Sequence, residues 1–314
     1  MQGLELSRRY YEEYGIPMIK ELFPEYENRI AAGLAGPGSD CFGFDDEISR
    51  DHDFGAGFCL WLTDEDNELF GFRLARAYGR LPLMFMDFEK GKTNSYGTAR
   101  YGVKTISDFY LPLTGSNGAP ESWQQWLFTS ENALAAATNG CVFRDDSGVF
   151  SRIRNEIKTE MPEDVRLKKL AARAALMAQS GQYNFGRCIA HGENGAAALA
   201  AAEFVRNTAS FVYLANGSFA PFYKWALKGM ESLELFSDFA PLLGKIITSG
   251  YSPDEIKSKQ DIIENICAQV AGYLRKSGLS ACKSDFLEPH AYEIQNKIKN
   301  PQIRTLHVME GGSL

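Results

Sequence analysis

Two kinds of pattern divide this chain. Between residues 30 and 115, apolar residues come in short runs bounded by glycine and aspartate, namely Ile30–Ala35, Phe58–Leu62 and Leu81–Phe88. Such runs are typical of strands in a buried sheet. From Glu121 onward, apolar spacing and capping signals are helical. The sequence therefore predicts an α+β protein: an N-terminal mixed sheet with helices over residues 1–118, then an all-α bundle over 119–314.

Helix ends are marked by residues with known terminal preferences. Residues Leu4–Leu22 have amphipathic spacing, and a second helix is expected over Asp66–Arg80. Pro162 with two following acids opens a helix that Gly181 is expected to close. Ser252 and Glu255 form a capping box for a helix that stops near Gly278. The last helix is expected to start at Ser284 and to end at Asn300-Pro301.

Charge and composition restrict the partners. Lys and Arg number 33 against 40 Asp and Glu, a net charge of −7, which disfavours long nucleic acid because that partner is held through its phosphates. The first fifteen residues are too charged for a signal peptide, and no window reaches the ~18 uncharged residues of a membrane span. The six cysteines are scattered, which is typical of reduced thiols. We therefore expect a cytoplasmic protein without a membrane partner.

One stretch, residues 36–54, concentrates residues that suit phosphate and metal chemistry. Gly38-Ser39 follows an apolar run, and Asp51-His52-Asp53 precedes the next run. On a strand, Asp51 and Asp53 would share one face, while His52 would point away as a packed histidine. Two carboxylates at that spacing can hold Mg²⁺, and the glycines allow backbone N–H groups to approach phosphate oxygens.

These residues resemble a known signature. Gly38-Ser39, eleven intervening residues and Asp51-His52-Asp53 are similar to the signature of the polymerase-β-like nucleotidyltransferase superfamily. The likeness is nearest to the small bacterial aminoglycoside and lincosamide nucleotidyltransferases. One branch of that group carries a stretch similar to GFDDEISRDHDF here, with motifs like Gly181-Gln182-Tyr183-Asn184 and Pro221-x-x-Lys224-Trp225. The resemblance covers roughly residues 20–235.

The resemblance implies both an activity and a set of site residues. Residues 1–118 would be the domain that binds nucleotide and metal. Gly38, Ser39 and Lys224 would hold the phosphates of a nucleoside triphosphate, with ATP favoured. Asp51 and Asp53 would be the catalytic residues and would bind Mg²⁺. A nucleoside monophosphate would pass to a hydroxyl-bearing small molecule or protein, with release of pyrophosphate.

One departure from the family pattern leaves alternatives open. The family has a third carboxylate on a later strand, but the matching residues Arg100–Ile106 contain no acid. Asp87 is the nearest acid by strand context, and Glu193 and Glu203 are candidate bases. A second hypothesis is a catalytically degenerate nucleotide-binding or interaction module on the same fold. A third is a metal-dependent hydrolase.

Other residues have simple structural interpretations. Lys224 could equally lie along apolar surface beside Trp225. Trp123 and Trp126 are expected in the core. The acids at 45–47 are expected to be solvated or to cap a helix.

Overall fold

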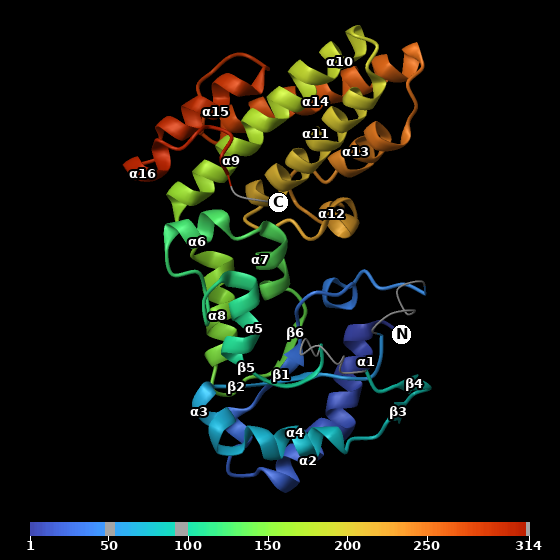
Figure 1. The fold of residues 1–314 in the computed structure, drawn as a ribbon, viewed down its shortest axis with the longest axis vertical. Coiled ribbons are helices and arrows are strands. Elements are labelled where there is room, and N and C mark those ends of the chain that lie inside the picture. Colours follow the sequence, from blue (N-terminus) through green and yellow to red (C-terminus); the bar gives the residue numbers. More distant parts are fainter. Residues whose placement is uncertain (48–53, 92–99, 312–314) are drawn as a thin grey trace. The chain divides into compact units, whose positions relative to one another are not determined.

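The computed structural model describes residues 1–47, 54–91 and 100–311 and has an α+β architecture. The chain divides into two compact units that alternate along the sequence (Figure 1). The first unit comprises residues 1–121 and 133–160, and the second comprises 122–132 and 161–314. Within the described ranges, no helix combines the length and apolar character needed to cross a membrane.

A four-stranded mixed sheet organises the first unit. Its strands are β1 (Ala31–Leu34), β2 (Cys59–Leu62), β5 (Gly102–Thr105) and β6 (Cys141–Arg144), in the order β5-β2-β1-β6. Strand β1 is antiparallel to both β2 and β6, whereas β2 and β5 are parallel. A separate hairpin pairs β3 (Met84–Phe85) with β4 (Phe88–Glu89).

Helices cover both faces of this sheet (Figure 1). They are α1 (Gly3–Tyr10), α2 (Ile16–Leu22), α3 (Asp64–Asp66), α4 (Phe72–Gly79), α5 (Ile106–Thr114), α7 (Glu131–Thr138) and α8 (Val149–Thr159). Phe58 precedes β2 and contacts Tyr78 of α4, with ring centroids 5.0 Å apart. Trp61 points to the opposite face and stacks on Phe150 of α8 at 3.9 Å. Strand β2 therefore lies between two layers of helices.

The second unit is helical. Its elements are α6 (Trp123–Phe128), α9 (Glu163–Met177), α10 (Gly186–Ala190), α11 (Asn194–Ala215), α12 (Tyr223–Met230), α13 (Phe239–Thr248), α14 (Pro253–Lys276), α15 (Leu287–Asn296) and α16 (Pro301–Arg304). A π-helical segment, Ala178–Phe185, joins α9 to α10 without a break. Helix α9 packs against both α11 and α15, so it lies at the centre of the bundle.

Several expected elements are confirmed. The runs at 30–35 and 58–62 form β1 and β2, and residues 3–22 are helical. The Ser252 hydroxyl accepts from the Glu255 N–H in a complete capping box at the start of α14, which ends at Lys276. Trp126 is 5% exposed, as expected for a core residue. All six cysteines are free thiols.

Other expectations are wrong. Gly181 does not end a helix; it lies inside the π-helical segment, where the missing side chain lets Phe204 approach. Asn300-Pro301 begins α16 rather than ending the previous helix, because the Asn300 side chain caps it and Pro301 takes its first position. Residues 141–144, in a region expected to be helical, form β6.

Candidate functional site

The Gly-Ser pair lies in a tight loop that directly follows β1. Two hydrogen bonds fix the start of the loop: the Gly36 N–H donates to the Asn139 side-chain oxygen (2.9 Å), and the Asn139 amide donates to the Gly36 carbonyl (2.8 Å). The Gly140 N–H donates to the Cys41 carbonyl at 2.7 Å and fixes the other end. Gly36 has a φ of 114°, a conformation that favours glycine. The loop is therefore held rigidly at both ends.

A buried ion pair supports the loop from behind. Asp40 is 2% exposed and forms an ion pair with the guanidinium of Arg100. Arg100 lies two residues before the start of β5. A Cβ atom at Gly38 would lie 2.7 Å from the Arg100 Cζ and 2.8 Å from an Asp40 oxygen. Only glycine fits at position 38 without displacing this pair. Burial lowers the pKa of Arg100.

The loop has backbone donors to spare. The Ser39 carbonyl accepts from the N–H groups of Phe42 and Phe44. In the part of the chain that the structure describes, the N–H groups of Gly38, Ser39 and Asp40 have no hydrogen-bond acceptor. Gly38 and Ser39 are partly exposed. Consecutive unengaged N–H groups of this kind are a typical anion site.

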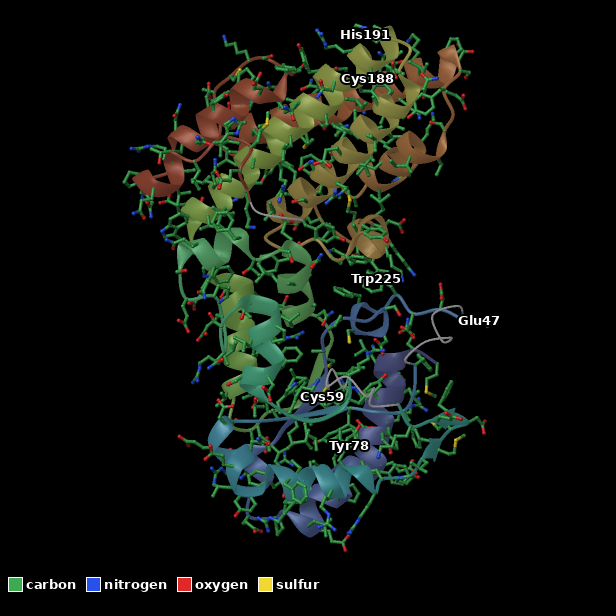
Figure 2. The ribbon with its side chains drawn as sticks, viewed as in Figure 1. Glu47, Cys59, Tyr78, Cys188, His191 and Trp225 are labelled. Carbon is green, nitrogen blue, oxygen red and sulfur yellow. The ribbon has the colours of Figure 1, made fainter. Side chains whose placement is uncertain are left out.

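Strand β5, which pairs with β2, carries one cationic residue and no acid. Residues 102–105 form β5, with Lys104 in register with Trp61 of β2, so the expected position of this strand is confirmed. The Lys104 charge lowers the pKa of the Cys41 and Cys59 thiols against the larger, raising effect of burial. Its ammonium therefore lies within electrostatic range of the Gly-Ser loop. Figure 2 labels Cys59 in the sheet.

Asp87 does not occupy a strand. The apolar run Leu81–Phe88 forms the β3–β4 hairpin, and Met86 and Asp87 are its two turn residues, with φ of 48° and 68°. The Asp87 side chain is exposed. The strand context that favoured Asp87 as a third carboxylate is therefore wrong.

Asp51 and Asp53, the predicted metal ligands, lie outside the described residues, as does His52. Before them, Asp45 accepts a hydrogen bond from the Gly3 N–H at 2.8 Å and so caps the start of α1. Glu47 is exposed (Figure 2). Of the two roles expected for the acids at 45–47, Asp45 thus takes the helix cap and Glu47 the solvated position.

Magnesium would have to rely on Asp51 and Asp53. Among the described side chains, no group of three or more His, Cys, Asp or Glu residues is placed to hold a metal ion. Asp40 is unsuitable as a ligand because one oxygen faces Arg100 and the other is buried beside Gly3. The described residues fit an anion, and they do not by themselves make a cation site.

Lys224 belongs to the second unit, in the first turn of α12. Its side chain is exposed, and the ammonium lies 5.5 Å from the Trp225 ring centroid. Of the candidate bases, Glu203 accepts a hydrogen bond from Asn207 at 2.9 Å, whereas Glu193 is exposed. Lys224 thus lies over an aromatic face and keeps its charge in solvent, which is compatible with either of its two expected roles.

The Gly-Gln-Tyr-Asn motif has a structural role at Gln182. Its amide donates to Glu264 (2.9 Å) and to the Asp285 carbonyl (3.1 Å), and its oxygen accepts from the Leu287 N–H (2.9 Å). Gln182 therefore joins the π-helical segment to α14 and to the start of α15. The motif stabilises the bundle at this position.

Comparison with known proteins gives limited matches. Residues 126–226, about a third of the chain, match the model of a family described as a domain of unknown function, DUF4037. A search of curated proteins finds no match. A solved structure titled as a nucleotidyltransferase-like protein from Exiguobacterium sibiricum 255-15 is 11% identical, with a TM-score of 0.37, over 85% of this chain and 80% of that chain. That similarity is too low for residue roles to be transferred.

The segment 126–226 contributes to a buried charge network that sequence patterns did not reveal. Glu131 is fully buried and accepts hydrogen bonds from Ser210 (2.7 Å) and Arg173 (3.2 Å). The Lys169 ammonium donates to the Leu127 carbonyl at 2.9 Å, and burial lowers the pKa of Lys169 to about 8. On the sequence, these charged residues have no motif spacing that would distinguish them from the exposed face of a helix.

Proposed function

We propose that this protein is a Mg²⁺-dependent nucleotidyltransferase that moves a nucleoside monophosphate from a nucleoside triphosphate to a hydroxyl group. The acceptor is a small molecule or a protein, and pyrophosphate is released. The observation that carries the proposal is the rigid loop after β1, with the unengaged N–H groups of Gly38, Ser39 and Asp40. Such a loop binds phosphate oxygens without any further rearrangement.

Each group in the site has a defined task. The loop N–H groups bind the triphosphate, and the Asp40–Arg100 pair keeps the loop in shape. Asp51 and Asp53 would hold Mg²⁺, which when bound would neutralise charge on the phosphates. The acceptor oxygen attacks the α-phosphorus, and the bond from the α-phosphorus to the oxygen that bridges the α- and β-phosphates breaks. Pyrophosphate leaves with the electron pair of that bond, and the acceptor proton passes to a base or to water.

A second candidate function is a nucleotide-binding module without turnover. It is favoured by β5, whose residues Gly102–Thr105 include Lys104 and no carboxylate. With fewer acids the site would bind metal less tightly, while a cation would still attract a triphosphate.

Pyrophosphate release with each of the four nucleoside triphosphates separates the two candidates. Asp51→Asn and Asp53→Asn are each expected to reduce release at least a hundredfold, because each removes a carboxylate charge from the metal. Asp87→Asn is the matched control, since Asp87 is an exposed turn residue and asparagine tolerates its φ of 68°. Nucleotide binding with no release, even with a metabolite extract as the acceptor source, contradicts the enzyme and supports the binding module.

A further inference from the structure

One helical stretch of the first unit exposes two large apolar side chains to solvent. It runs without a break from α3 through the π-helical turn Asn67–Gly71 into α4 (Figure 1). Leu69 is 60% exposed and Phe72 is 75% exposed, although side chains of this size usually bury most of their area. The opposite side of the stretch is buried in the first unit and consists of Phe70, Leu74 and Tyr78. The stretch therefore has a packed side and an apolar surface outside it.

Charged residues of opposite sign flank this apolar surface. Glu65 and Glu68 precede it, Arg73 and Arg76 follow it, and all four side chains are exposed. The Arg76 guanidinium lies over the Phe72 ring, 6.0 Å from its centroid, so both side chains belong to the same surface. Within residues 1–47, 54–91 and 100–311, none of the four charged side chains forms an ion pair. We call the whole set the α4 face, which consists of Glu65, Glu68, Leu69, Phe72, Arg73 and Arg76.

The α4 face is symmetric about a point between residues 70 and 71. The two apolar residues lie at equal distances on either side of this point, and so do the acids and the arginines. Two copies of the helix, packed antiparallel about a two-fold axis there, would place each residue level with its counterpart in the other copy. Each contact would occur twice, namely Leu69 with Phe72, Glu68 with Arg73, and Glu65 with Arg76.

The helix dipole explains only part of this arrangement. It favours acids near the start of a helix and bases near its end. It gives no reason for two large apolar side chains to be exposed between them. A self-complementary surface accounts for both observations, because a symmetric dimer buries the apolar side chains at its axis and pairs the charges around them. An anionic membrane is disfavoured as the partner, since the two acids would be repelled by it.

We propose that the α4 face binds the same face of a second copy of this chain and forms a symmetric dimer with antiparallel helices. The apolar residues at the centre stabilise the dimer, and the charge pairs determine its register and orientation. One face of a single helix is a small interface, so the dimer dissociates on dilution. The contact uses residues of the first unit alone and does not depend on the proposed transferase activity.

Sedimentation velocity of the full chain, at concentrations up to about 0.2 mM, measures the dimer. Phe72→Ser is expected to weaken dimerisation about a hundredfold, because each dimer loses two buried rings. Leu111→Ser is the matched control for loss of an exposed apolar side chain. Leu111 is 50% exposed on α5 and lies outside the α4 face, so its replacement is expected to leave dimerisation unchanged.

Exchange of charges tests the register of the two helices. Glu68→Arg and Arg73→Glu are each expected to weaken self-association about tenfold, because each creates two contacts between like charges. An equimolar mixture of the two variants is expected to associate as the parent does, because both contacts join opposite charges in the mixed dimer. Glu12→Arg is the control, since Glu12 is an exposed acid of the first unit outside the α4 face, and it is expected to have no effect.

Three results would overturn the proposal. The first is a parent chain that stays monomeric at about 0.2 mM, and the second is a dimer that Phe72→Ser leaves intact. The third is a mixture of Glu68→Arg and Arg73→Glu that associates no better than either variant alone. Binding of a monomeric parent to phosphatidylserine vesicles, lost in Phe72→Ser, would be a form of the first result and would identify a lipid surface as the partner.

Discussion

Replacing Glu131 by alanine should destabilise the second unit severely. Glu131 is fully buried and is the counter-ion of Arg173, whose side chain is 3% exposed. Arg173 also donates to the neutral side chains of Ser210 and Asn207. Removing one member of a buried ion pair costs about 3–5 kcal/mol, because it leaves an uncompensated charge. The neutral acceptors place the expected loss near the lower end, about 3 kcal/mol.

Amide hydrogen exchange measures this loss within the second unit alone. Amides of α9 and α11 that exchange only on unfolding should exchange about a hundredfold faster or more in Glu131→Ala, since each 1.4 kcal/mol is a factor of ten. Glu163→Ala is the control. Glu163 pairs with Arg166 at 2.7 Å, both residues being on α9, but Glu163 is largely exposed, so the loss of this pair should cost less than about 1 kcal/mol. Equal effects of the two substitutions would refute the assignment of Glu131 as the counter-ion of Arg173.

Two further predictions concern the loop and the buried lysine. Gly38→Ala should weaken ATP binding and lower the free energy of unfolding of the first unit by about 1–3 kcal/mol, because the added Cβ collides with Arg100 and Asp40. Gly43→Ala is the control for backbone strain alone, since Gly43 has a φ of 71° and an added Cβ there would meet no atom within 4 Å. Equal ATP affinity in the two variants would contradict the collision. The folded-state pKa of Lys169, about 8, lies below its ordinary value of 10.5, so the unfolded chain binds more protons between those pH values and stability should rise with pH there. The stability of the parent relative to Lys169→Met, measured by urea unfolding, should therefore increase by about 2 kcal/mol from pH 8 to pH 9.5. A flat difference would show that Lys169 keeps its proton in the folded protein across this range and that its pKa is not lowered.

The sequence predicts elements whose signals are local. The apolar run ending at Leu62 and the capping box at Ser252 each determine their own structure, and both are confirmed. Strand β6 is four residues long, and all four are partly exposed. Its extended conformation therefore depends on pairing with β1 rather than on an apolar pattern of its own. At the β3–β4 turn, Asp87 is a residue type that tolerates a positive φ, but Met86 is not, so only half of the turn is marked in the sequence.

The same distinction applies to the candidate site. The position of Gly38-Ser39 after a strand follows from neighbouring residues. The groups that hold this loop cannot be predicted from neighbouring residues, because Arg100 is sixty residues beyond Asp40 and Asn139 is 103 residues beyond Gly36. Neither contact leaves a pattern in the sequence. A role for Asp51 stays a prediction.

The pairing of β1 with β6 decides where the chain can be cut. A fragment that stops at residue 118 would lack β6, and the backbone N–H and C=O groups of β1 that bond to it would become an open sheet edge. Such an edge recruits strands from other molecules, and the fragment would tend to aggregate. A soluble truncation of the first unit has to retain residues 133–160, because they contain β6, the strand that pairs with β1. These residues follow the segment 122–132, which belongs to the helical unit.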